Sequence, residues 1–156
     1  MLASATVPIV STQHIGAAGE LLVQYRLLKL GIDSARLTTD AGIDLVVYAP
    51  GDRSATTVQV KANLAPKPAG GRGPMSRGWY FQHDCPAQVI ALVALDVDTV
   101  WLLTLEEAKQ HAQQHSSKGV RQLYWRVDVP AGGSSVKYER QMSRYLLEVR
   151  APELFP

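Results

Sequence analysis

The stretch GIDLVVYAPGDRSATTVQVKANLAPKP, residues 42–68, decides the fold that the sequence predicts. Two of its runs, IDLVVYA and ATTVQVKA, are rich in β-branched residues, and the turn formers PGD lie between them. We therefore expect two strands joined as a hairpin. Polar residues interrupt both runs, with Asp44 in the first and Gln59 and Lys61 in the second. Because side chains alternate between faces along a strand, pairing would gather these three groups on one side of the sheet.

A helix is expected before this hairpin, over residues 12–30, where apolar residues recur at helical spacing. Its section GAAG, residues 16–19, has almost no side chains, so the helix can lie very close to a sheet. Glu20 follows this section directly, and we expect the helix to cover the side of the sheet that carries the three polar groups. His14 is interpreted as a residue of the helix start rather than as a phosphate contact.

The remaining pattern alternates strands and helices and indicates an α/β fold with a mixed sheet flanked by helices. The run VIALVAL is nearly all apolar, which is typical of a central strand covered on both faces. Strands are expected at 34–39, 79–82, 86–96, 99–105 and 122–129, and further helices at 105–115 and 138–149. We expect a single domain over residues 1–156, with its core at about 12–115 and a C-terminal strand and helix at 120–150.

The composition is that of a globular protein and limits the kinds of protein that the chain can be. The 156 residues are 46% hydrophobic and 19% charged, which is ordinary for one globular domain. A net charge of +2 is compatible with a nucleic-acid partner without being specific for one. The single cysteine, Cys85, excludes an internal disulfide and a cysteine-based zinc site, so a reducing cytoplasm is expected. The N-terminal residues do not resemble a signal peptide, and VIALVAL is too short to span a bilayer, so no membrane partner is expected.

The polar residues of the hairpin and the helix include several with oxygen atoms that can bind a divalent metal ion. The carboxylates of Asp44 and Glu20 and the amide oxygen of Gln59 are hard ligands suited to Mg²⁺ or Mn²⁺, and the carbonyl of Val60 could add another. Such a metal polarises a phosphate oxygen. Lys61 could orient a water molecule or stabilise the negative charge that develops.

Three segments together resemble the PD-(D/E)XK nuclease superfamily, which has a restriction-endonuclease-like fold: GxxGE in the first helix, GIDLVV and VQVKAN. The resemblance extends from residue 14 to about 109. It implies an αβββαβ-type core in which Asp44 is the metal-binding aspartate, Gln59 the (D/E) position, Lys61 the motif lysine and Glu20 the glutamate of the first helix. It further implies a Mg²⁺- or Mn²⁺-dependent endonuclease that hydrolyses phosphodiester bonds in DNA.

The sequence departs from the family pattern at Gln59, where an amide replaces an acid and removes one negative charge. Some branches of the family, including certain homing endonucleases, use this Q-x-K version and remain active. The departure also supports an alternative, a catalytically inactive nuclease-fold module that binds nucleic acid or a protein partner. Since no further DNA-reading domain is evident, strong sequence specificity would need a homodimer or a protein partner.

A basic loop follows the hairpin, at residues 64–78, and contains several prolines and glycines but no acid. One interpretation is a solvated connection. The other, which we favour, is a flexible arm whose Lys67, Arg72 and Arg77 contact phosphates, while Trp79 and Tyr80 stack on unpaired bases.

Two histidine patterns suggest weaker alternatives. Cys85 and His83 could form a thiol nucleophile and its base, but no oxyanion-hole signal accompanies them, so an incidental buried thiol is favoured. His111 and His115 have a spacing that can hold a metal on a helix. Without the glutamate of an HExxH motif, a solvated helix face is the better interpretation.

Overall fold

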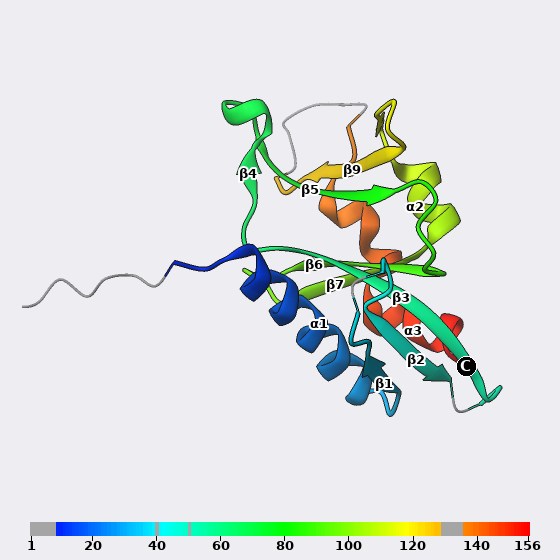
Figure 1. The fold of residues 1–156 in the computed structure, drawn as a ribbon. Coiled ribbons are helices and arrows are strands. Elements are labelled where there is room, and N and C mark those ends of the chain that lie inside the picture. The colour runs from blue at the N-terminus through cyan, green and yellow to red at the C-terminus, as the bar shows by residue number, and fades with distance from the viewer. Residues whose placement is uncertain (1–8, 40, 50, 129–135) are drawn as a thin grey trace, which may run out of the picture.

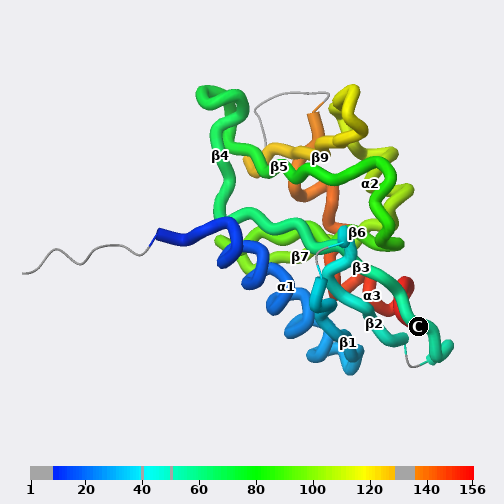
Figure 2. Tube along the Cα trace, viewed as in Figure 1, coloured from blue at the N-terminus to red at the C-terminus, as the bar shows by residue number. Residues whose placement is uncertain are grey.

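The computed structural model describes residues 9–39, 41–49, 51–128 and 136–156, and Figures 1 and 2 show the arrangement of the chain. The helices are α1 (Thr12–Leu28), α2 (Leu105–His111) and α3 (Leu147–Leu154), with 3-10 helices η1 (Ala69–Gly71) and η2 (Glu139–Tyr145). The strands are β1 (Asp33–Arg36), β2 (Leu45–Ala49), β3 (Ser54–Asn63), β4 (Lys67–Pro68), β5 (Met75–Gln82), β6 (Val89–Ala94), β7 (Thr99–Thr104), β8 (Gln114–His115) and β9 (Val120–Arg126).

The first sheet has five strands in the order β1-β2-β3-β6-β7. Only the β3–β6 pair is parallel among these neighbours, and the others are antiparallel. All residues of β6 are buried, as expected for a strand covered on both faces. The predicted fold class, a mixed α/β sheet flanked by helices, is confirmed.

A second, four-stranded antiparallel sheet, β4-β5-β9-β8, lies across one face of the first. The sequence pattern predicted segments of β5 and β9 but not their pairing into a separate sheet. Between the sheets, Trp125 packs against Trp79 and Trp101, with ring centroids 4.7 and 4.9 Å away. Aromatic pairs at such separations stabilise a core beyond the apolar area they bury.

The first sheet therefore has a core on each face. On one face α1 and α3 pack against alternate residues of β2, β3, β6 and β7, and Val23, Val58 and Leu147 are among the buried residues. On the other face the second sheet, α2 and η2 enclose Trp79, Ile90 and the rest of the second core. A side chain of β3 therefore packs in the first core or in the second, depending on the face of the strand from which it projects.

The structure differs from the predicted elements mainly near the C-terminus. The helix predicted at 138–149 is divided into η2 and α3 by Leu146, whose backbone is extended and forms a β-bridge with Trp101 of β7. Tertiary pairing thus interrupts a segment with helical periodicity. Among the described residues, no helix is long and apolar enough to cross a membrane.

Candidate active site

The site begins where β2 ends its pairing with β3. Leu45, the first residue of β2, pairs with Val58, so β3 has an open edge beyond that point. The Asp44 amide donates to the Val58 carbonyl at 2.9 Å, and an Asp44 carboxylate oxygen accepts from the Val60 amide at 2.7 Å. Since the N–H and C=O of one strand residue point to the same side, the Val60 carbonyl faces this edge too. The Asp44 carboxylate and the Val60 carbonyl thus bring two oxygen atoms, both possible metal ligands, to the same edge of β3.

Glu20 lines the same cleft as Asp44. This cleft has a volume of about 400 Å³ and lies between α1 on one side and residues 36–39 and Asp44 on the other. The Glu20 carboxylate accepts from the Arg36 guanidinium at 2.7 Å, and both side chains are partly exposed. The two acidic residues of the predicted site therefore line one cleft, and the guanidinium of Arg36 is paired with Glu20 there.

Gln59 and Lys61 project from the other face of β3. The sulfur of Cys85, in the second core, lies 3.4 Å from the Gln59 amide oxygen, where its S–H can donate weakly. Lys61 lines a second hollow, which has a volume of about 1120 Å³. The expectation that the first helix covers the side of Gln59 and Lys61 is therefore wrong, because α1 packs on the opposite face.

The reason is the position of Gly19. A Cβ at this residue would lie 2.6 Å from the Ala62 Cβ and 3.4 Å from a Val60 methyl carbon, so the small residue allows α1 to touch β3 there. Val60 and Ala62 alternate with Gln59 and Lys61 along the strand. The close approach that the sequence predicted is present, but on the face of the alternate residues.

The donor set suits a hard divalent cation. The oxygen atoms of Asp44, Glu20 and the Val60 carbonyl are ligands that Mg²⁺ and Mn²⁺ prefer. Gln59 projects from the other face of β3 and is not among the residues that line the cleft. The described residues contain no group of three or more His, Cys, Asp or Glu side chains that could hold a metal.

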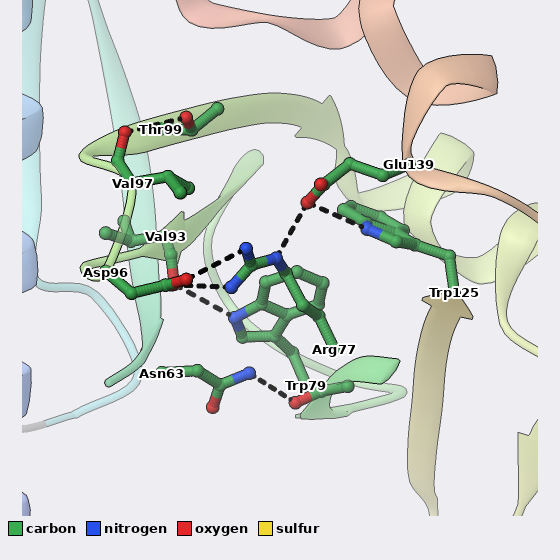
Figure 3. A network of polar contacts seen from close by, with 10 residues as sticks. Asn63, Arg77, Trp79, Val93, Asp96, Val97, Thr99, Trp125 and Glu139 are labelled. Atoms are coloured by element: carbon green, nitrogen blue, oxygen red, sulfur yellow. Dashed lines mark hydrogen bonds and ion pairs between the residues drawn. The ribbon is translucent and has the colours of Figure 1, made fainter. Parts of the chain in front are cut away.

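Two of the predicted nucleic-acid contacts are buried instead. Arg77 and Trp79 are each only 2% exposed. The guanidinium of Arg77 donates two bonds to Asp96, at 2.6 and 3.1 Å, and one to Glu139 at 2.7 Å, while the Trp79 indole donates to the Val93 carbonyl (Figure 3). The prediction that Arg77 and Trp79 contact DNA is therefore wrong, because both point into the interior between the sheets.

The other three predicted contacts are exposed. Lys67, Arg72 and Tyr80 lie at the surface, and Tyr80 is 59% exposed. Sequence reasoning missed Gln122 and Tyr124 of β9, which line the same hollow as Tyr80. The signal was available in the run VRQLYWR, where buried Leu123 and Trp125 alternate with less buried neighbours.

His14 and His83 each have a hydrogen-bond partner on the protein. His14 forms a capping box with Ser11 at the start of α1, their side chains 2.7 Å apart, which confirms the helix-start interpretation. His83 accepts from Arg121 at 2.7 Å, whereas Cys85 lies beside Gln59. A nucleophile–base pair of Cys85 and His83 is not formed in this arrangement.

His111 and His115 do not share a helix, because α2 ends at His111 and His115 lies on β8. His111 is half-buried and hydrogen-bonds the Tyr145 hydroxyl at 2.8 Å, so a solvated face was the wrong interpretation for it. Burial lowers the pKa of His111, and the positive charges of Lys137 and Arg144 lower it further. His111 thus contacts Tyr145, a residue of the second core.

Comparisons with known proteins find similarity among solved structures. No protein-family model matches the chain, and no curated sequence does so significantly. Among solved structures, the bacterial homing endonuclease I-Ssp6803I superposes with a TM-score of 0.63 over 94% of this chain and 96% of that one, at 12% identity. The chain shares the fold of this endonuclease. At so low an identity the likeness concerns the fold alone.

Proposed function

We propose that this protein is a metal-dependent endodeoxyribonuclease of the PD-(D/E)XK superfamily, in its Q-x-K form, which hydrolyses phosphodiester bonds in DNA. The observation that carries the proposal is the Asp44 carboxylate held on the open edge of β3 by the Val60 amide at 2.7 Å. Glu20 lines the same cleft, and the fold is shared with a homing endonuclease.

The proposed metal ligands are the oxygen atoms of Asp44, Glu20, Gln59 and the Val60 carbonyl. A bound Mg²⁺ or Mn²⁺ would supply Lewis-acid stabilisation of the charge that develops on the phosphate. The Val60 amide fixes one Asp44 oxygen and leaves the other available. Glu20 has to exchange its Arg36 partner for the cation, which would release a guanidinium within the same cleft for a phosphate oxygen.

Lys61 is the proposed catalytic cation. Its side chain lines the larger hollow, which meets the smaller cleft at Thr12 and Gly16, because those two residues line both. During hydrolysis a water oxygen bonds to phosphorus while the bond to the leaving sugar oxygen breaks. An ammonium beside these oxygens can orient the water and stabilise the extra negative charge.

The proposal is tested by a cleavage screen on plasmids and oligonucleotides with Mg²⁺ and Mn²⁺, comparing the wild type with Asp44→Ala and Asp44→Asn. Asn retains an oxygen for the Val60 amide, so its fold is protected while the charge is removed. We expect both variants to lose cleavage and metal-induced stabilisation. Asp98→Asn is the control, since it removes a carboxylate from an exposed turn away from both hollows. Wild-type cleavage by a folded Asp44→Asn variant would overturn the site.

A catalytically inactive module that binds nucleic acid or a protein is the second candidate. The neutral amide at Gln59 and the Glu20–Arg36 ion pair favour it, because both weaken the attraction for a cation. Such a module would show no rise in melting temperature with divalent ions, whereas a ligand that binds the folded state raises it. We place either activity in the cytoplasm, where the free thiol of Cys85 stays reduced, and assign specificity to a homodimer or a protein partner.

A further inference from the structure

The side of the second sheet that faces away from the first sheet forms a surface, here called the outer face. On β5, Ser76, Gly78 and Tyr80 alternate with the buried Arg77, Trp79 and Phe81. The register of β4, β8 and β9 adds their cross-strand neighbours. Those that line the larger hollow are Lys67, Ser76, Gly78, Tyr80, Gln114, Gln122 and Tyr124, whereas Arg126, the partner of Ser76, lies outside it.

This hollow is a groove without negative charge. Its opposite wall is formed by the start of α1 and the end of β3, where Lys61 lies. Among the described residues, no Asp or Glu lines the groove, and the sequence has no acid between Asp52 and Asp84. The half-buried Lys61 and the exposed Lys67 both bring positive charge to it, so the groove is complementary to an anionic chain.

The outer face also presents hydrogen-bonding groups that the fold does not use. Within the described part of the chain, the side chains of Gln114 and Gln122 and the hydroxyls of Tyr80 and Tyr124 have no intramolecular hydrogen bond. Gly78 keeps the surface flat between them, because a Cβ there would lie 3.3 Å from both the Gln122 amide nitrogen and the Tyr124 Cβ. Flat aromatic faces with free amides beside them suit nucleotide bases.

We propose that the outer face binds unpaired nucleotides of the DNA strand that is cut. Tyr80 and Tyr124 stack on bases, Gln122 hydrogen-bonds base edges, and the two groove lysines contact phosphates. This inference rests on the proposed function for the identity of the substrate. The groove and the cleft share Thr12 and Gly16, so one strand can occupy both.

Charge and shape favour unpaired nucleotides over intact duplex. A protein that binds duplex DNA through its phosphates uses many cations, about 6–10 contacts in strongly salt-dependent cases. Two lysines line this groove, and only Lys67 is exposed. Proteins that recognise the sequence of duplex DNA insert a protruding helix or β-ribbon into the major groove. A concave surface with a tyrosine 59% exposed offers instead a place where separated bases can stack.

Fluorescence anisotropy with the full chain tests this inference, using a labelled single-stranded oligonucleotide and the duplex of the same sequence, both in EDTA. We expect Tyr80→Ala and Tyr124→Ala each to weaken single-strand binding by about 5- to 100-fold, as expected for loss of one stacked base, with a much smaller effect on duplex. Tyr80→Phe keeps the ring and should bind like the wild type. Tyr48→Ala, an exposed tyrosine of β2, is the matched control.

Two results would overturn the inference: unchanged single-strand binding in folded Tyr80→Ala and Tyr124→Ala, or equal losses on single strand and duplex. The EDTA keeps this test independent of cleavage. Tyrosine-dependent single-strand binding by a wild type that cleaves nothing would support the outer face and reject the nuclease. Asp44-dependent cleavage with no tyrosine effect on binding would reject the outer face and support the nuclease.

Discussion

At Gln59, a neutral amide stands where a carboxylate would bring a charge to the proposed metal site. Its oxygen already lies 3.4 Å from the Cys85 sulfur, a weak contact that costs little to exchange. We predict that Gln59→Glu tightens Mg²⁺ or Mn²⁺ binding and keeps or raises cleavage, because a third negative charge beside those of Asp44 and Glu20 attracts the cation more strongly. Isothermal titration against Gln110→Glu, which adds the same charge to exposed α2, checks this. Equal affinities in wild type and Gln59→Glu would remove Gln59 from the site.

Single residues also show what the sequence could and could not indicate. The spacing of Asp44, Gln59 and Lys61 predicted adjacent strands because alternation and turn chemistry are local. Arg77 was misjudged because a basic residue in a glycine-rich loop is expected to be solvated. Its partners Asp96 and Glu139 lie 19 and 62 residues further along, a separation that no local pattern reveals.

The packing of helix α1 on strand β3 depends on one glycine. This dependence predicts how a substitution there changes the stability of the protein. A Cβ at Gly19 would lie 2.6 Å from the Ala62 Cβ, so Gly19→Ala must displace the helix from the strand that carries Val60. Overpacking of this kind costs about 1–3 kcal/mol, more than the roughly 0.5–1 kcal/mol gained by removing a helical glycine. We therefore expect a lower free energy of unfolding, measured by urea denaturation.

Gly16 provides the control for this substitution. It lies one helical turn earlier, and a Cβ there would meet nothing within 4 Å. Gly16→Ala should therefore stabilise the protein by about 0.5–1 kcal/mol. If both alanine variants were stabilised alike, the close packing of α1 on β3 would be contradicted.

The basic loop gives a second prediction, which concerns DNA binding by Lys67 and Arg72. Arg77 is left out of the substitution because it is buried. Replacing the exposed Lys67 and Arg72 together by Ala should weaken DNA binding and leave metal affinity unchanged. The slope of log affinity against log salt should become shallower by roughly 0.7 per lost contact on single strands, or 0.9 on duplex. Lys29→Ala with Arg140→Ala removes two exposed charges elsewhere. An unchanged slope in the loop variant would make the loop a connector only.

Strands and helices with strong periodicity were predictable, but their association was not. β5 pairs with β9 across β6, β7 and α2, and this pairing creates the second sheet. Local propensity indicates that a segment is extended without indicating its partner, because cross-strand contacts determine what a strand gains. The second core and the outer face could therefore not be predicted from the sequence pattern.

At the scale of the whole molecule, a charged link joins the two sheets in addition to the apolar core between them. Arg77 of the second sheet bonds Asp96, which follows β6 of the first, and Glu139 of η2 (Figure 3). The hydrogen bond from Arg77 lowers the pKa of Asp96 from its ordinary value of 3.8, against the opposing effect of burial. Burial alone would lower the pKa of Arg77, but its bonds to Asp96 and Glu139 outweigh burial and raise it. The link is therefore fully charged at neutral pH.

Acid should weaken this link, and Asp96→Asn should reveal how much of the acid sensitivity it causes. Because the pKa of Asp96 is lower in the folded protein than in the unfolded chain, its stabilising effect is complete above about pH 4 and is lost as the pH falls through the folded-state value. We predict that Asp96→Asn lowers the melting temperature at pH 7, since the buried guanidinium then keeps only Glu139 as an anionic partner. As the pH falls below about 4, the melting temperature of the variant should fall less steeply than that of the wild type. Asp98→Asn removes a carboxylate from the same β6–β7 turn that forms no ion pair among the described residues, and it should follow the wild-type profile. Parallel profiles for the wild type and Asp96→Asn would mean that Arg77 does not link the two sheets through this carboxylate.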